Sequence, residues 1–209
     1  MTKSLTVHHQ DTLPGSTHLP DTHQDTFSKT LLGFWMYLMS DCLIFACLFV
    51  NYALFHSSTF GGPSSKELFS LSSAFLETML LLFSSVSCGF GMLAAVKNKT
   101  RKVLFWFGVT FLLGASFVVI EVVEFADLVH AGSDWTVSAF LSSFFALVGT
   151  HGLHVSFGLL WMSVMMSQLA LQGITVNTFR RLVIFSLFWH FLDVIWIFIF
   201  TFVYLIGVI

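Results

Sequence analysis

Charge is what this sequence has least of. Only 10% of its 209 residues are Asp, Glu, Lys or Arg, whereas 56% are hydrophobic. Because soluble domains carry about 25% charged residues, this composition excludes an ordinary soluble globule and indicates an integral membrane protein. The formal net charge of −2 also means that the chain has no overall positive charge to attract a nucleic acid, so no nucleic-acid partner is expected.

Proline and cysteine are scarce as well. The three prolines and 26 phenylalanines are typical of helices embedded in lipid. The three cysteines, Cys42, Cys47 and Cys88, all lie in apolar segments, and no two of them form a Cys-x-x-Cys motif. We interpret them as small apolar side chains rather than as metal ligands or a redox pair.

Long apolar runs are abundant, and five of them can each cross a bilayer as a helix. The sequence therefore predicts an all-α fold, an integral membrane bundle of five transmembrane helices. The predicted spans cover about residues 30–55, 68–96, 103–130, 135–171 and 180–208, within a transmembrane domain of residues 29–209. Residues 1–28 are polar and lack the apolar core of a cleavable signal peptide, so they are predicted to form a disordered cytoplasmic tail.

The positions of the basic residues predict the orientation. Seven of the nine Lys and Arg residues lie outside the predicted spans, and the other two, Arg180 and Arg181, are the first two residues of the fifth. If the N-terminus is cytoplasmic, eight of the nine fall on the inner side and only Lys66 falls on the outer side. This asymmetry follows the positive-inside rule, so we expect a cytoplasmic N-terminus and a periplasmic C-terminus.

Ionisable residues inside the spans are few, and most come in pairs three positions apart. Away from the span ends, the pairs are Glu121/Glu124, His151/His154 and His190/Asp193, and the single acids are Asp41 and Glu77. Residues three apart share a helix face, so each pair marks a face that looks into the bundle or onto a partner. With no Lys or Arg in the middle of the spans, these acids must be protonated, paired with histidine, or bonded to another subunit or lipid.

Three interpretations of these polar residues are open at this point. The first is structural, with hydrogen bonds between helices worth about 0.6 to 2 kcal/mol each. The second is a metal site, but helical di-iron proteins use Glu-x-x-His on two helices, and no intramembrane pair has that sequence. The third is a proton-coupled transporter, although no two segments resemble repeats. We expect His151 and His154 to meet His190 and Asp193 and to join the fourth and fifth spans.

Three longer motifs carry a resemblance to a known family. Residues 188–196 read Phe-Trp-His-Phe-Leu-Asp-Val-Ile-Trp, residues 149–155 read Gly-Thr-His-Gly-Leu-His-Val, and residues 40–45 read Ser-Asp-Cys-Leu-Ile-Phe. They resemble the W-H-F-[LV]-D-V-[IV]-W, G-x-H-G-L-H-V and S-[ED]-x-x-[FL]-F motifs of subunit III of the heme-copper respiratory oxidases. The resemblance covers the chain from about Phe34 onward, leaving only the tail outside. It is greatest to the five-helix form in bacterial bo-type ubiquinol oxidases.

The resemblance implies a non-catalytic subunit of a bacterial inner-membrane complex. Such a complex oxidises ubiquinol, reduces oxygen to water and pumps protons in the aerobic respiratory chain. The implied partners are oxidase subunits I, II and a small subunit IV, with hemes and copper in subunit I and no metal, cofactor or catalytic residue in this chain. Subunit III of the family also binds phospholipid in a cleft and supports sustained turnover and proton uptake. Because the five-helix form lacks two helices that border this cleft, a lipid site here is expected to be shared with another chain.

The resemblance draws attention to Asp41, at a position where the cytochrome c branch of the family usually has Glu. By helix rise, Asp41 lies near mid-membrane. We interpret it either as an influence on proton uptake into subunit I or as a hydrogen bond between helices. The other intramembrane polar residues are candidate structural or lipid-linked sites: Glu77, Glu121, Glu124, His151, His154, His190 and Asp193.

Alternatives to the quinol-oxidase subunit are a cytochrome c oxidase subunit III and a small proton-coupled transporter. Because the electron donor docks on another subunit, ubiquinol, menaquinol and cytochrome c all remain open as donors of the complex.

Overall fold

Five long helices make up the protein, which we describe from a computed structural model for residues 22–55, 71–132 and 136–205. The helices are α1 (Thr22–Phe55), α3 (Leu71–Val96), α4 (Thr100–His130), α5 (Ala139–Gln172) and α6 (Val176–Ile199), and a π-helix, η1 (Phe200–Leu205), continues α6. All five are long and apolar enough to cross a membrane. The described part of the chain contains no strand, so the predicted all-α bundle of five spans is confirmed.

Helix ends differ from the predicted spans where polar residues extend a helix beyond the apolar run. α1 begins at Thr22, within the 1–28 segment that was predicted to be disordered. Its first turns are steadied by α6, since the Arg180 guanidinium lies 5.0 Å from the centroid of the Phe27 ring. Residues 1–21, the rest of the predicted tail, lie outside the described residues.

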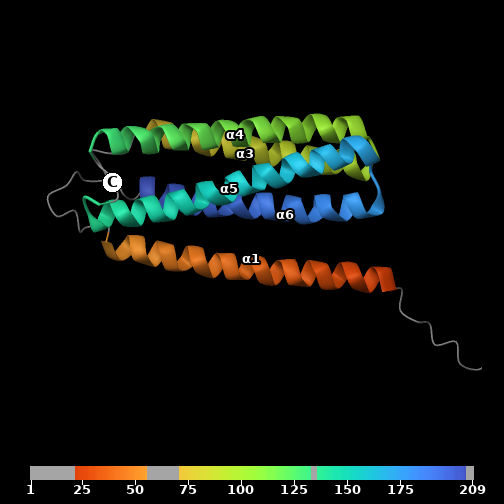
Figure 1. The fold of residues 1–209 in the computed structure, drawn as a ribbon, viewed down its shortest axis with the longest axis horizontal. Helices are drawn as coiled ribbons and strands as arrows, with labels where there is room; N and C mark the ends of the chain where they lie inside the picture. The colour runs from red at the N-terminus through yellow and green to blue at the C-terminus, as the bar shows by residue number, and fades with distance from the viewer. Residues whose placement is uncertain (1–21, 56–70, 133–135, 206–209) are drawn as a thin grey trace, which may run out of the picture.

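Short connections place consecutive helices side by side and antiparallel. The α3–α4 turn contains Asn98 at a φ of 52°, a left-handed conformation that asparagine tolerates better than most residues. α5 ends at Gly173, whose φ is 69°, and the Thr175 hydroxyl then accepts a hydrogen bond from the Thr178 amide at the start of α6. Both turns lie at the same end of the bundle (Figure 1).

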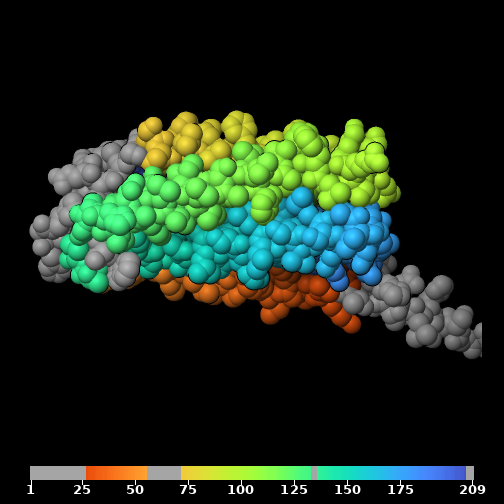
Figure 2. Space-filling view, turned by 45° about the horizontal axis from the view of Figure 1, so that its top comes forward, coloured from red at the N-terminus to blue at the C-terminus, as the bar shows by residue number. Residues whose placement is uncertain are grey.

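The centre of the bundle is built around two tryptophans of α6. Trp189 and Trp196 are the largest fully buried side chains. Glycines on α4 and α5 make room for Trp189: a Cβ atom at Gly114 would lie 2.9 Å from its ring, and one at Gly158 would lie 3.1 Å from it. α3, α4, α5 and α6 pack together as a four-helix unit. The space-filling view shows α3, α4, α5 and the start of α6 as one continuous surface, with α1 along its edge (Figure 2).

α1 lies on the outside of this four-helix unit and packs on α5 and α6 (Figure 1). Its buried side chains, Leu38, Asp41, Phe45 and Tyr52, recur at helical spacing and form one narrow stripe. The remaining surface of α1 is apolar and exposed; Leu43, for example, is 69% exposed. That surface therefore faces lipid or another subunit.

Candidate functional site

A polar contact joins α1 to α5 in the middle of the α1 stripe. The Asp41 Oδ2 atom lies 3.7 Å from His154 Nε2, and the two side chains are 6% and 19% exposed. Tyr37, one turn earlier on α1, lies beside the same carboxyl group. Phe45, one turn later, packs on the His154 ring with 5.4 Å between ring centroids. The Asp41–His154 pair is thus part of the surface by which α1 docks.

The tautomer of His154 follows from the contact that its Nδ1 atom makes. Nδ1 lies 2.8 Å from the backbone carbonyl oxygen of Thr150. A carbonyl oxygen only accepts hydrogen bonds, so Nδ1 donates, and Nε2 is the nitrogen that faces Asp41. At 3.7 Å the two atoms are too far apart for a direct hydrogen bond. The contact therefore brings together, from two helices, two groups that can each bind a proton.

A second polar cluster contains three glutamates. Glu77 on α3 lies within electrostatic range of Glu121 and Glu124 on α4, and Tyr204 of η1 lies beside all three. Glu77 is 1% exposed and Glu121 is 5% exposed. Neither carboxyl oxygen of Glu77 has a hydrogen-bond partner among the described residues. Burying such a group is costly unless a proton, a water or an external partner satisfies it, so this cluster is a second candidate polar site.

His151 lies in an aromatic cage rather than in a polar site. The side chain is completely buried, and neither ring nitrogen has a hydrogen-bond partner in the described part of the chain. Its ring centroid lies 5.2 Å from that of Trp196, 5.9 Å from Phe117 and 6.3 Å from Phe45. His151 therefore connects α1, α4, α5 and α6 by packing.

The prediction that His190 and Asp193 meet His151 and His154 is wrong. His190 Nδ1 lies 2.7 Å from Ser85 Oγ on α3 and 3.8 Å from Asp193 Oδ2 on its own helix. A spacing of three residues predicts that two side chains share a face, but it does not say which neighbouring helix that face meets. Here the polar face of α6 meets α3, while the polar face of α5 turns toward α1.

Hydroxyl groups on α3 are the partners that the sequence reasoning missed. The Trp189 indole N–H donates to Ser84 Oγ at 2.9 Å, and the Trp196 indole N–H donates to Thr78 Oγ1 at 3.1 Å. Together with the Ser85–His190 contact, these bonds form a hydroxyl ladder between α3 and α6. The two helices are antiparallel, so Thr78, early in α3, bonds to Trp196, late in α6. Several hydroxyl residues in one apolar span, at 78, 84, 85 and 87, were a signal that could have predicted it.

These contacts define the class of protein. It is a helical membrane protein that crosses the bilayer several times, and several of its intramembrane polar side chains join one helix to another. In the described part of the chain, no group of three or more His, Cys, Asp or Glu side chains is arranged to hold a metal ion.

Comparison with known proteins then shows the family. The model of the family described as cytochrome c oxidase subunit III matches residues 3–208. Since the match covers nearly the whole chain, the protein belongs to this family, and the predicted resemblance to subunit III of the heme-copper oxidases is confirmed. The match also extends through most of the 1–28 segment, which the motif resemblance had left out.

Curated relatives cover most of this chain and most of their own length. The cytochrome bo(3) ubiquinol oxidase subunit 3 of Pseudomonas aeruginosa is 49% identical over 199 residues, which are 91% of this chain and 95% of the relative. The protein of the same name from Pseudomonas putida is 52% identical, covering 88% and 89%. The cytochrome c oxidase subunit 3 of Bacillus sp. (strain PS3) is 45% identical, covering 85% and 86%.

The chain is therefore subunit III of an oxidase complex, an accessory subunit of an oxidoreductase rather than an enzyme on its own. It is a multi-pass protein of the bacterial inner membrane.

Proposed function

We propose that the complex to which this subunit belongs is a proton-pumping ubiquinol oxidase of the bo type. The observation that carries the proposal is the identity to relatives named cytochrome bo(3) ubiquinol oxidase subunit 3, at 49% and 52% over nearly the full length of both chains. A cytochrome c oxidase is the second candidate, supported by the relative of that name at 45%.

In this proposal the redox chemistry belongs to other chains. Hemes and copper reside in subunit I, and subunits I and II and a small subunit IV assemble with this chain. The exposed apolar surface of α1 supports such an arrangement, because a surface of this kind suits either a partner subunit or phospholipid. Phospholipid bound between this chain and subunit I would fill the cleft that the five-helix form cannot close alone.

The proposal also assigns a role to Asp41. It influences proton uptake into subunit I, and the position of its carboxyl group, 3.7 Å from the imidazole of His154, supports this role. The same contact also holds α1 on α5, so the functional and structural contributions of Asp41 must be separated by experiment.

Purification of the complex through a tag on this chain, in mild detergent, tests the function. We expect subunits I and II to co-purify, heme absorption in the complex and none in the isolated chain, and oxidation of ubiquinol in preference to menaquinol and cytochrome c. Oxidation of cytochrome c without quinol oxidation would favour the second candidate. A colourless chain that purifies alone would contradict both.

A further inference from the structure

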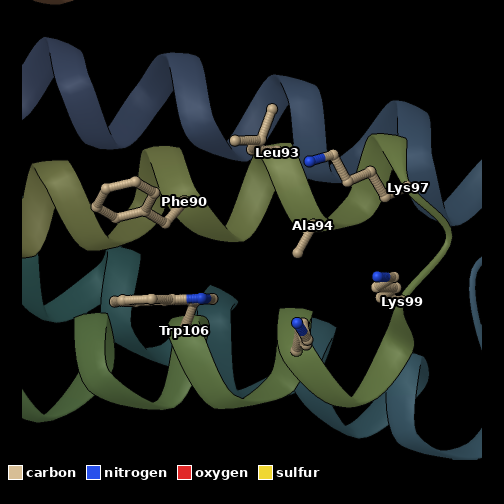
Figure 3. Close-up of a pocket in the computed structure, with 7 residues that line it drawn as sticks. Phe90, Leu93, Ala94, Lys97, Lys99 and Trp106 are labelled. Atoms are coloured by element: carbon tan, nitrogen blue, oxygen red, sulfur yellow. The ribbon is translucent and has the colours of Figure 1, made fainter.

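A basic groove lies at the turn between α3 and α4. It has a volume of about 160 Å³, and its polar lining is Lys97, Lys99 and Lys102. Phe90 on α3 and Trp106 on α4 are the aromatic residues of its lining, with ring centroids 5.0 Å apart. Figure 3 shows the lysine nitrogens at one end of the groove and the two rings at the other, with the indole nitrogen turned toward the lysines.

The walls of the basic groove are held in place by contacts between the two helices. The Ser87 hydroxyl donates to the Trp106 carbonyl oxygen at 2.9 Å. Gly91 lets the helices approach, because a Cβ atom there would lie 2.7 Å from the Phe107 ring. The groove is therefore a shaped feature of the α3–α4 hairpin and not only a set of basic residues near the membrane.

Negative charge that would neutralise this groove is absent from the neighbouring sequence. There is no Asp or Glu between Glu77 and Glu121, which includes the second half of α3 and the first half of α4. None occurs between Asp134 and Asp193 either, so α5 and the start of α6 supply none at this end. The first turn of α4 also contains no acidic residue. No acidic side chain of α3, α4, α5 or α6 lies at this end of the bundle, so an anion is the complementary ligand for the three lysines.

The level at which the groove lies in the bilayer indicates which kind of anion it binds. By helix rise, Phe90 lies about 10 Å from Lys97 along α3, and Trp106 lies about 6 Å from Lys102 along α4. The polar layer on each side of a bilayer is about 5 to 8 Å thick, so the lysines reach the headgroups while the rings lie at the level where acyl chains begin. The space is too small for a helix but suits a phosphate-bearing headgroup.

We propose that the basic groove binds the headgroup of an anionic glycerophospholipid from the leaflet that the α3–α4 turn faces. The three ammonium groups and the Trp106 N–H contact the phosphate and ester oxygens, and an acyl chain runs along Phe90 and Leu93. This site is built by one chain, so it is separate from the lipid cleft that the family resemblance implies between this chain and a partner.

The test uses the complete oxidase complex in nanodiscs of phosphatidylcholine that contain a small fraction of photoreactive phosphatidylglycerol. We expect labelling of peptides from residues 90–106, and much weaker labelling by a photoreactive phosphatidylcholine. A triple variant, Lys97→Gln, Lys99→Gln and Lys102→Gln, removes the charge of the groove. Each lysine near an anionic headgroup contributes about fivefold in affinity, so labelling should fall on the order of a hundredfold.

A charge-matched control changes three cations at the same end that do not line the groove, as Arg101→Gln, Arg180→Gln and Arg181→Gln. This control should retain labelling of residues 90–106. An equal loss in the control, or equal labelling by the two lipids, would overturn the proposal, because the effect would then come from diffuse charge. If the triple glutamine variant fails to assemble, the single Lys102→Gln variant in the same assay should lose about fivefold, and unchanged labelling would contradict the site.

A photoreactive residue in place of Leu93 shows whether phospholipid or another subunit covers the groove. Crosslinks to phospholipid in the assembled complex would support the proposal, and crosslinks to another subunit would overturn it.

Discussion

At the residue scale, the buried acids of this protein differ in what satisfies them. Asp41 faces an imidazole from a neighbouring helix, whereas Glu77 has no hydrogen-bond partner among the described residues. An imidazole next to a carboxyl group can accept its proton, so Asp41 is the better candidate for a role in proton movement. Glu77 is the better candidate for a site that holds a proton or water in place.

Asp41→Asn separates the two roles of that residue, since asparagine keeps the shape and hydrogen bonding of aspartate but cannot release a proton. We expect the variant complex to assemble normally and to lose activity or turnover lifetime, relative to the wild type, as pH rises and proton supply becomes limiting. Oxygen consumption across a pH series measures this. Normal turnover of a fully assembled Asp41→Asn complex at high pH would rule out the proton role. Asp41→Leu is the companion variant, and it should impair assembly at every pH.

Ser84→Ala tests the hydroxyl ladder between α3 and α6. The change leaves the buried Trp189 indole N–H without its acceptor, so the free energy of unfolding should fall by about 1 to 3 kcal/mol. Ser116→Ala is the matched control, because the Ser116 hydroxyl is exposed and bonds to the Leu112 carbonyl oxygen of its own helix. Thermal denaturation of the purified complex measures both. Equal effects of the two changes would show that the indole bond adds nothing to stability.

At the scale of the elements, the helices pack closely where glycine faces a large ring. Gly114 lies on α4 against Trp189 of α6, with Gly158 of α5 on another side of the same ring. A bilayer supplies little hydrophobic force between helices, so this close packing and the indole hydrogen bonds hold the four-helix unit together. α1 has fewer such contacts, and its narrow stripe makes it the helix that depends most on a single polar pair.

Gly114→Ala should therefore destabilise the bundle, because the new Cβ atom would lie 2.9 Å from the Trp189 ring. We expect a loss of about 1 to 3 kcal/mol, seen as a lower melting temperature of the complex. Gly89→Ala on α3 is the control, since no atom lies within 4 Å of a Cβ there. Similar melting temperatures for Gly114→Ala and the wild type would show that the ring moves aside without cost.

At the scale of the whole molecule, charge is distributed unevenly between the two ends of the bundle. The α3–α4 and α5–α6 turns lie together at one end (Figure 1), and these turns and the starts of α4 and α6 contain six basic residues: Lys97, Lys99, Arg101, Lys102, Arg180 and Arg181. Glu121, Glu124 and Asp127 lie toward the opposite end of α4. The basic end is the one expected in the cytoplasm, and it is also where the basic groove opens.

Reporter fusions test this orientation. A reporter inserted in the basic turn at Asn98 should be cytoplasmic, and one fused after Ile209 should be periplasmic. A reporter inserted after Gly132, at the other end of α4, is the internal reference and should also be periplasmic. The same location for the Asn98 and Ile209 reporters would contradict the predicted topology.

The sequence by itself determined the class of protein and the number of spans. Hydrophobic length, scarce charge and the absence of Lys and Arg from the middle of the spans follow from what a bilayer requires of any helix, so they could be predicted without knowing which helices touch. The motifs around His151 and His190 likewise predicted the family, which the comparison with known proteins confirmed. The pairs at three-residue spacing also predicted polar faces, and Glu121 and Glu124 do form one cluster.

Only the tertiary structure decided which of these faces meet. His190 bonds to Ser85 on α3, His154 pairs with Asp41 on α1, and His151 is caged by aromatic rings. The periodicity of one helix fixes a direction relative to its own axis, but the partner depends on how all five helices are rotated against each other. That rotation is set by the shapes of side chains from different helices, such as Trp189 in the space left by Gly114, and a single helix does not contain this information.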